Sequence, residues 1–338
     1  MKALSYRGAK KFSIIEKDIP EAGAGEVVVR IAYCGICGTD RHIYHGVMDE
    51  RVKPPMIPGH EMSGTIHTIG EDVTGYKVGQ KVTVRPLDPD YECIACKMGF
   101  SHICQNLNFI GADSDGAFQQ YWKVSAEILH ALPEVMDLEL AALAEPLAVA
   151  CHDVSRSGLK KGDRVAIIGG GPIGLLIALV AQLDGADVRL LEISKERRDV
   201  AEDMGIKTID SLSVDPVDAV FDWTNGDGAD VVFEVSGSKP GALMMTGLAR
   251  PRGKIVVVGI FGAPAEIVLK EVFLRELDIS GARVYQAEDF DRSITLLSEN
   301  KAPWRKVISR VAPIEEADDC FASLDKQVDL MKILIDFR

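Results

Sequence analysis

The stretch RVAIIGGGPIGLLIALVAQL, residues 164–183, decides the fold of this 338-residue chain. A short apolar run typical of a buried strand is followed by a glycine turn and an uncharged helical pattern. Strand, Gly-x-Gly-x-x-Gly turn and helix in this order indicate a dinucleotide-binding unit. Gly169 permits the tight turn, Gly171 lets the backbone approach a pyrophosphate, and Gly174 lets the helix pack on the strand.

The segments after residue 183 extend this unit. Further strand patterns alternate with helical patterns, and such alternation predicts a doubly wound parallel sheet, the Rossmann arrangement. The expected strands cover 164–168, 186–191, 230–235, 254–259 and 277–281, and the expected helices 175–183, 195–204, 288–299 and 314–325.

Glu192 ends the second strand, 18 residues after Gly174. A carboxylate at this position accepts hydrogen bonds from an adenosine ribose and repels a 2′-phosphate, so NAD is favoured over NADP. Arg197 lies close behind and softens that preference. The residues predicted to contact the cofactor are Gly169, Gly171, Pro172, Ile173, Gly174, Glu192, Arg197, Val258 and Gly259.

Residues 1–85 have a different character. The β-branched run 26–32 is bounded by glycines, and Gly and Pro interrupt the chain repeatedly after it. This pattern predicts an irregular antiparallel β domain.

Charge and cysteine content exclude several classes of protein. The net charge of −13 disfavours binding to nucleic acid or to anionic membranes. The N-terminus has no apolar region of a secretory signal, and Gly169–Pro172 interrupts the one uncharged stretch that resembles a membrane span. An odd count of seven cysteines without a signal argues against a disulfide framework, and a cytoplasmic location is expected.

Two groups of residues have the chemistry of metal ligands. Cys37 is followed 23 and 24 residues later by His60 and Glu61. Thiolate, imidazole and carboxylate suit zinc, and three protein ligands leave a fourth position open. Singly, each of these residues is more often buried, solvated or paired. The second group is Cys93-x₂-Cys96-x₇-Cys104.

Several motifs together resemble one family. They occur in the right order across nearly the whole chain: Cys37-Gly-Thr-Asp-x-His42, Gly59-His-Glu61, Gly70-x-x-Val73, Val78-Gly-x-x-Val82, Glu145-Pro-Leu147 and the glycine turn. The combination is similar to the zinc-dependent medium-chain dehydrogenase/reductase family. Its Glu-Pro-Leu element resembles the polyol (sorbitol-type) dehydrogenase branch.

The resemblance implies roles for residues of the first group. Cys37 and His60 would bind a catalytic zinc, and Glu61 would be the third ligand or move in and out of the shell. Glu145 would bind the zinc or hold its water. Asp40 would orient the His60 ring.

The resemblance also implies an activity. Thr39 and His42 would form a proton relay through the nicotinamide ribose to solvent while hydride moves from a secondary alcohol to NAD, because an alkoxide is a better hydride donor than an alcohol. The expected substrates are a polyol, a sugar alcohol or a sugar acid, oxidised to the ketone.

The second group resembles the family's structural zinc lobe. The usual pattern has a cysteine three residues before Cys93, where this chain has Asp90. Zinc accepts carboxylate oxygen, so an Asp90, Cys93, Cys96, Cys104 site is expected. An empty lobe is the alternative, and His102 is a competing ligand off the expected spacing.

The resemblance implies an architecture. Residues 1–147 and 286–338 would form a GroES-like catalytic domain, and residues 148–285 the NAD-binding Rossmann domain. Relatives assemble as dimers or tetramers through the cofactor domain, so a homodimer or homotetramer is expected.

The substrate is less defined. Tyr44 and Tyr285, with Phe109 and Gln119, are the predicted walls of its site. Sorbitol dehydrogenases have an Arg-Tyr pair where this chain has Val284-Tyr285, so another sugar alcohol, a small diol or a sugar acid fits equally well.

Two other functions stay open. L-Threonine 3-dehydrogenases share the Cys-Gly-Thr-Asp-x-His element. A catalytically silent NAD-binding sensor of the same fold is the other, although the intact ligand set argues against it.

Overall fold

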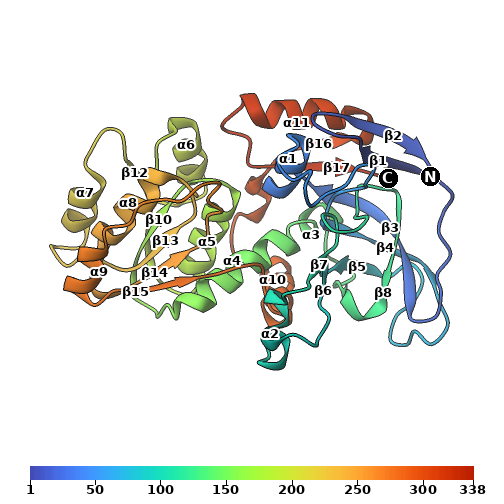
Figure 1. The fold of residues 1–338 in the computed structure, drawn as a ribbon, viewed down its shortest axis with the longest axis horizontal. Coiled ribbons are helices and arrows are strands. Elements are labelled where there is room, and N and C mark those ends of the chain that lie inside the picture. The colour runs from blue at the N-terminus through green and yellow to red at the C-terminus, as the bar shows by residue number, and fades with distance from the viewer. The chain divides into compact units, whose positions relative to one another are not determined.

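The computed structural model describes residues 1–338, and its contacts divide the chain into two compact units (Figure 1). Unit 1 contains Met1–Pro146 and Gln286–Arg338. Unit 2 contains Leu147–Tyr285. Unit 1 is therefore built from both ends of the chain.

Unit 2 is a six-stranded parallel sheet with the strand order β12-β11-β10-β13-β14-β15. This confirms the predicted doubly wound sheet. Its strands are β10 (Arg164–Ile168), β11 (Asp187–Glu192), β12 (Thr208–Asp210), β13 (Ala229–Glu234), β14 (Ala249–Val257) and β15 (Asp278–Gly281). Its helices are α5 (Pro172–Leu183), α6 (Lys195–Asp203), α7 (Pro216–Trp223), α8 (Lys239–Leu248) and α9 (Leu269–Arg275), and α4 (Ala144–Ser157) precedes β10.

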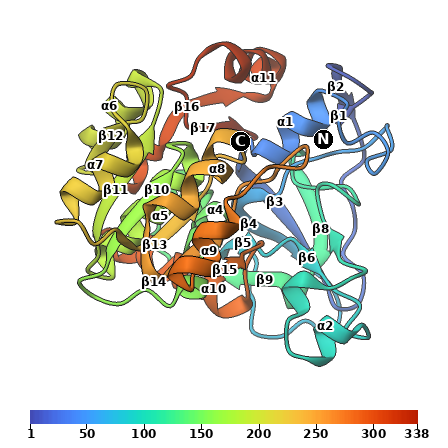
Figure 2. The same ribbon diagram turned by 60° about the vertical axis from the view of Figure 1, so that its left-hand side comes forward.

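The apolar runs of the sequence explain how this sheet is buried. Helices α5 and α6 pack on β10, β11 and β12, whereas α7, α8 and α9 contact one another in a row along the sheet (Figure 2). Strands covered by helices read as continuous apolar runs, and Ile167 and Phe233 on neighbouring strands are fully buried. Helix α5 is apolar over most of its length, but no helix combines the length and apolarity needed to cross a bilayer.

Unit 1 contains a seven-stranded, mainly antiparallel sheet in the order β16-β17-β3-β4-β5-β9, with β8 paired to β3. The strands are β3 (Glu26–Gly35), β4 (Glu61–Ile69), β5 (Lys81–Val84), β8 (Tyr121–Ser125), β9 (Leu129–Ala131), β16 (Ile308–Pro313) and β17 (Lys332–Asp336), and two short pairs join β1 (Lys2–Tyr6) to β2 (Phe12–Glu16) and β6 (Leu87–Asp88) to β7 (Asn108–Phe109). The helices are α1 (Gly38–Tyr44), α2 (Ile94–Lys97), α3 (Leu138–Ala141), α10 (Ala287–Glu299) and α11 (Ala317–Lys326).

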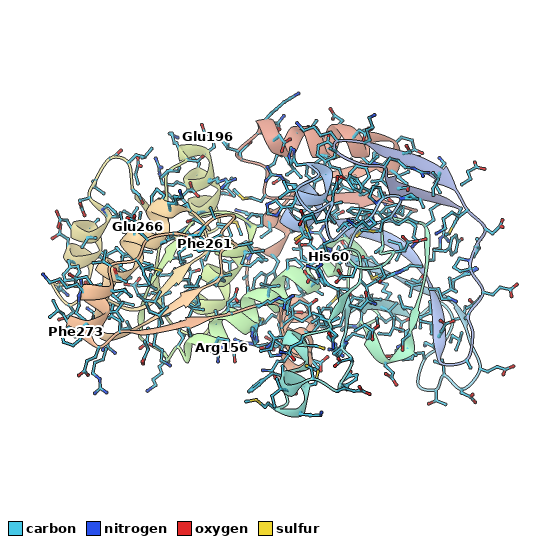
Figure 3. The ribbon with its side chains drawn as sticks, viewed as in Figure 1. His60, Arg156, Glu196, Phe261, Glu266 and Phe273 are labelled. Atoms are coloured by element: carbon cyan, nitrogen blue, oxygen red, sulfur yellow. The ribbon has the colours of Figure 1, made fainter.

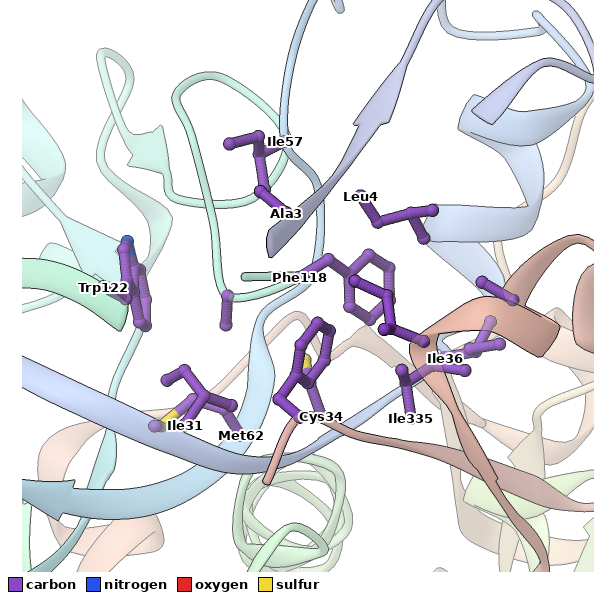
Figure 4. Close-up of a cluster of buried hydrophobic side chains, with 14 of the residues drawn as sticks. Ala3, Leu4, Ile31, Cys34, Ile36, Ile57, Met62, Phe118, Trp122 and Ile335 are labelled. Carbon is purple, nitrogen blue, oxygen red and sulfur yellow. The ribbon is translucent and has the colours of Figure 1, made fainter. Parts of the chain in front are cut away.

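Strand β17 joins the two ends of the chain in one sheet. It pairs with β16 on one side and with β3 on the other, where Leu334 lies opposite Gly35. Sequence analysis predicts helices in this C-terminal segment and misses both strands, because the two runs are short and carry charged residues. Ile335 of β17 packs with Phe118 and Ile36 in the core of unit 1 (Figure 4).

The aromatic part of this core yields a stability prediction. Phe321 on α11 is fully buried, with ring centroids 4.7 Å from Phe12 and 5.1 Å from Tyr44. We expect Phe321→Ala to lower the free energy of unfolding by about 3–5 kcal/mol, because it leaves a cavity where three rings meet. Urea unfolding followed by circular dichroism measures this change.

Val135 provides the control, since it is 94% exposed. Val135→Ala should change the free energy of unfolding by less than about 0.5 kcal/mol. Equal losses for the two variants would contradict the assignment of Phe321 to the core.

Candidate active site and metal centres

The pairing of β3 with β4 brings the first group of predicted ligands together. Gly35 at the end of β3 lies opposite Glu61 at the start of β4. The chain then turns into α1, where the backbone N–H of Cys37 donates to Asp40 Oδ2 at 2.8 Å. Residues distant in sequence therefore meet at one end of the strand pair, and His60 lies within unit 1 (Figure 3).

Cys37, His60 and Glu61 each offer a donor atom, and these atoms all lie within 4.8 Å of one another. His60 and Glu61 are buried, and Glu61 Oε2 has no hydrogen-bond partner. A buried acceptor without a partner is costly, and a cation would satisfy it. Thiolate, imidazole and carboxylate with one position open are the donors of a catalytic zinc site, so these residues fit that metal.

The negative charges around His60 stabilise its positively charged form. Burial raises the pKa of Asp40 to about 6. Burial alone would lower the pKa of His60, but the negative charges of Asp40 and Cys37 raise it to about 10. Asp40 Oδ1 lies 3.9 Å from His60 Nδ1. This position agrees with the prediction that Asp40 orients the His60 ring.

Lys332 is a member of this site that sequence analysis misses. Its Nζ donates to Glu61 Oε1 at 2.7 Å, and the side chains of Lys332 and Glu61 are 4% and 1% exposed. Lysine is normally a surface residue, so the residue type alone does not predict a buried position for Lys332. The one available signal was its position at the start of the apolar run Ile333–Ile335.

The other predicted catalytic residues surround the group. Glu145 on α4 is buried, and its charge acts on both His60 and Lys332, but its carboxylate does not join the 4.8 Å set. Thr39 is half-buried and His42 is exposed, both on α1. Residues three apart lie on one side of a helix, so Thr39 and His42 share a face of α1.

Asp90, Cys93, Cys96 and Cys104 form the second group, with donor atoms again within 4.8 Å. Asp90 Oδ1 is 3.2 Å from the Cys104 sulfur and 3.7 Å from the Cys96 sulfur. Hydrogen bonds from Asn106 and from backbone N–H groups hold the pKa of Asp90 well below its usual range. Four converging donors fit a closed structural zinc site, and His102 lies outside them.

The glycine turn of unit 2 has the geometry expected for a dinucleotide. Gly169 has φ +106°, which only glycine adopts easily, and a Cβ at Gly174 would lie 2.0 Å from the Gly169 carbonyl oxygen. A Cβ at Gly171, the N-cap of α5, would have no neighbour within 4 Å. This turn therefore packs α5 tightly on β10 and leaves the helix N-terminus open to phosphate.

Glu192 stands behind the turn. Its Oε2 accepts from the Gly170 N–H at 2.7 Å, its Oε1 accepts from the Ser194 N–H at 2.8 Å, and Arg197 approaches to 3.9 Å. Pro172 and Ile173 begin α5. The backbone N–H groups of Val258 and Gly259, just after β14, both donate to the Glu234 carbonyl oxygen at 2.8 Å.

Both tyrosines that are predicted to contact the substrate are buried. Tyr285 is fully buried in unit 2, and the Tyr44 ring stacks on Phe12 and Phe321 in unit 1. Of the other predicted walls, Gln119 is buried, and the Phe109 ring lies with its centroid 4.8 Å from that of His60. Substrate contact by the two tyrosines stays a prediction.

A parallel Rossmann sheet, a GroES-like β unit and an open thiolate–imidazole–carboxylate group together define a zinc-binding dehydrogenase. The family model described as Alcohol dehydrogenase GroES-like domain matches residues 23–134, and the one described as Zinc-binding dehydrogenase matches residues 172–299. The chain belongs to the zinc-containing medium-chain dehydrogenase/reductase family of alcohol dehydrogenases.

Similar proteins include two dehydrogenases and one solved structure. The 2-dehydro-3-deoxy-L-galactonate 5-dehydrogenase of Pseudoalteromonas atlantica is 48% identical, over 99% of this chain and 98% of that protein. The sorbitol dehydrogenase of Halalkalibacterium halodurans is 34% identical over 99% of both. A short chain alcohol dehydrogenase of E. coli CFT073, complexed with cofactor NADH, has a TM-score of 0.89 and 29% identity over 99% of both chains.

The two groups of donors predict two zinc ions per chain. We expect Cys37→Ser and Cys96→Ser each to remove one of them, because serine is a poor ligand for zinc. Only Cys96→Ser should lower the melting temperature markedly, by about 5 °C or more, since a closed structural site contributes folding free energy. Elemental analysis and calorimetry measure the two effects.

Ser101→Ala lies in the same lobe as Cys96 but outside the donor group, so it should keep both ions. A wild-type protein that binds a single zinc, lost only on mutation of Cys37, would show that Asp90 does not complete a site.

Proposed function

We propose that this protein oxidises a secondary alcohol of a sugar acid to the ketone with zinc and NAD. The observation that carries the proposal is 48% identity along 99% of the chain to a 5-dehydrogenase of a 2-dehydro-3-deoxy sugar acid. The buried donor set of Cys37, His60 and Glu61 supports it. Oxidation of a polyol is the broader form of the same proposal.

The residues of unit 1 would divide the work. Cys37, His60 and Glu61 would hold the catalytic zinc, with Glu145 nearby as a further ligand or as the residue that holds a water. When bound, the metal supplies a Lewis acid that lowers the pKa of the substrate hydroxyl. Thr39 would take up the hydroxyl proton as it gives its own proton on through the nicotinamide ribose, and exposed His42 would release a proton to solvent at the end of this relay.

Unit 2 would bind the cofactor at its glycine turn. The pyrophosphate would lie at the N-terminus of α5, where free N–H groups and the helix dipole favour negative charge. Glu192 is fixed by two backbone N–H groups, and its charge disfavours the 2′-phosphate of NADP. Arg197 lies 3.9 Å from Glu192, so the carboxylate partly offsets the positive charge that Arg197 would offer to a 2′-phosphate.

An assembly of two copies through unit 2 completes the proposal. Strand β15 is an edge strand bonded only to β14, and such an edge can pair with its own copy about a two-fold axis. Unit 2 also exposes apolar side chains, with Phe273 on α9 81% exposed and Ile260 76% exposed. A groove of about 580 Å³ is lined by Ile279 of β15 and by Phe261. A large exposed apolar patch indicates a partner.

A cytoplasmic location is also proposed. Its support is that all seven cysteines are free thiols, as is usual in reducing compartments.

A substrate panel tests the proposed activity. The purified protein is assayed for cofactor reduction with 2-dehydro-3-deoxy-L-galactonate, sorbitol, 2,3-butanediol and L-threonine, each with NAD⁺ and with NADP⁺. We expect the sugar acid with NAD⁺ to give a kcat/KM at least about 100-fold above that of threonine, and a zinc chelator to abolish it. Spectrophotometry at the nicotinamide absorption band measures the rate.

Other results have defined meanings. Turnover of threonine alone would make the protein an L-threonine 3-dehydrogenase. A protein that contains zinc and binds NADH but oxidises nothing on the panel would favour a sensor.

The proposed dimer is tested by light scattering after size-exclusion chromatography. We expect a dimer or a tetramer for the wild type and a smaller species for Phe273→Glu, because a charge in an apolar interface is costly to bury. Val135→Glu, on an exposed residue of unit 1, should leave the mass unchanged. A monomeric wild type would sink the proposal.

A further inference from the structure

Lys332 and Glu61 form an ion pair that is almost wholly removed from water. Lys332 Nζ lies 2.7 Å from Glu61 Oε1 and 3.3 Å from the Ile36 carbonyl oxygen. Burying two charges costs more solvation than a single contact usually returns, so such a pair is weak evidence for a role in stability. Its place beside Cys37 and His60 indicates another role.

The pair holds the Glu61 carboxylate by one end. Oε1 is occupied by Lys332, whereas Oε2 is buried without a hydrogen-bond partner. Gly35 of β3 leaves room for this oxygen, because a Cβ there would lie 2.3 Å from Oε2 and 3.3 Å from Lys332 Cδ. The lysine and the glycine together fix an orientation in which one oxygen is available to a metal.

The charges around Lys332 matter as much as its geometry. The groups that act on it are Glu61, Cys37 and Glu145, all of them negative when ionised. The thiolate of Cys37 and the carboxylate of Glu61 would together cancel the charge of a divalent cation. The ammonium of Lys332 adds one positive charge that offsets the charge of Glu145, and a less negative site favours ionisation of a substrate hydroxyl.

We propose that Lys332 is a positioning residue of the catalytic metal centre, which fixes Glu61 by one oxygen and offsets its charge. A divalent metal bound by Cys37, His60 and Glu61 then lies in a site that is one unit of charge more positive than it would be without the lysine. This inference rests on the proposed function, because it takes these three residues as the ligands. Lys332 acts through Glu61 and contacts neither substrate nor cofactor in this account.

A double-mutant cycle on the full-length protein tests it. The variants are Lys332→Met, Glu61→Gln and the pair combined, with Lys332→Arg as the conservative replacement. Lys81→Met is the matched control, since Lys81 lies in the same sheet and donates to the backbone carbonyl of Met136. Each protein is loaded with Co²⁺ for its absorption spectrum and with Zn²⁺ for chelator competition and for the pH profile of kcat.

Lys332→Met should change the Co²⁺ ligand-field bands, because Glu61 Oε1 becomes free to reorient toward the metal. It should also move the acidic midpoint of the kcat profile upward by about one pH unit, as expected when a nearby positive charge is lost. Lys332→Arg should restore most of both effects, and Lys81→Met should resemble the wild type. In the Glu61→Gln background the same lysine change should shift the midpoint by less than half as much.

Equal shifts in the two backgrounds, or unchanged bands and midpoint in Lys332→Met, would overturn the inference. If Lys332→Met does not fold, the double variant removes both buried charges and should fold, and a shift of a full pH unit between it and Glu61→Gln would then overturn the inference.

The two proposals can fail separately. A wild-type Co²⁺ protein without a thiolate-to-metal absorption band would reject the ligand set itself, and the proposed function with it. A normal wild-type band, together with unchanged Co²⁺ bands and an unchanged kcat midpoint in Lys332→Met, would reject only the role of Lys332.

Discussion

Burial of several ionisable groups at one point is the constraint on which unit 1 depends. Asp40, His60, Glu61 and Glu145 are all nearly inaccessible to water. Buried charges persist only when they are paired or when they bind a metal, so this point needs positive charge from elsewhere. Lys332 supplies one such charge from the far end of the chain, because the pairing of β17 with β3 brings it to Glu61 in a unit that is discontinuous in sequence.

The two donor groups use similar ligands, but they differ in burial and in the number of donors. Around Asp90 there are four donors, three of them partly exposed, and Asp90 already accepts from two backbone N–H groups. Around Cys37 the donors are three, mostly buried, and include an oxygen without a partner. A closed set of four holds a loop in place, whereas an open set of three has capacity left for a substrate.

The sequence predicts unit 2 far better than unit 1. Its glycine turn and apolar strands are local signals, and Gly169 shows the positive φ that the turn requires. Unit 1 depends on pairings between distant segments, so local sequence patterns do not predict β16 and β17. The sequence does identify Cys37, His60 and Glu61 as candidate ligands. The ligands carry their own chemical signature, but Lys332 has the residue type of a surface side chain, and only its partner explains its burial. The Tyr44 ring stacks on Phe12 and Phe321 in the aromatic core, and its predicted contact with substrate stays a prediction.

The discontinuity of unit 1 also orders events during synthesis. The ribosome makes β3, α1 and β4, then the whole of unit 2, and only afterwards β17. Unit 2 can therefore fold while Gly35 still lacks its neighbour Leu334 and Glu61 still lacks its lysine. Throughout that interval the nascent chain carries an unpaired strand edge, and the site around Glu61 is completed only after β17 has been made.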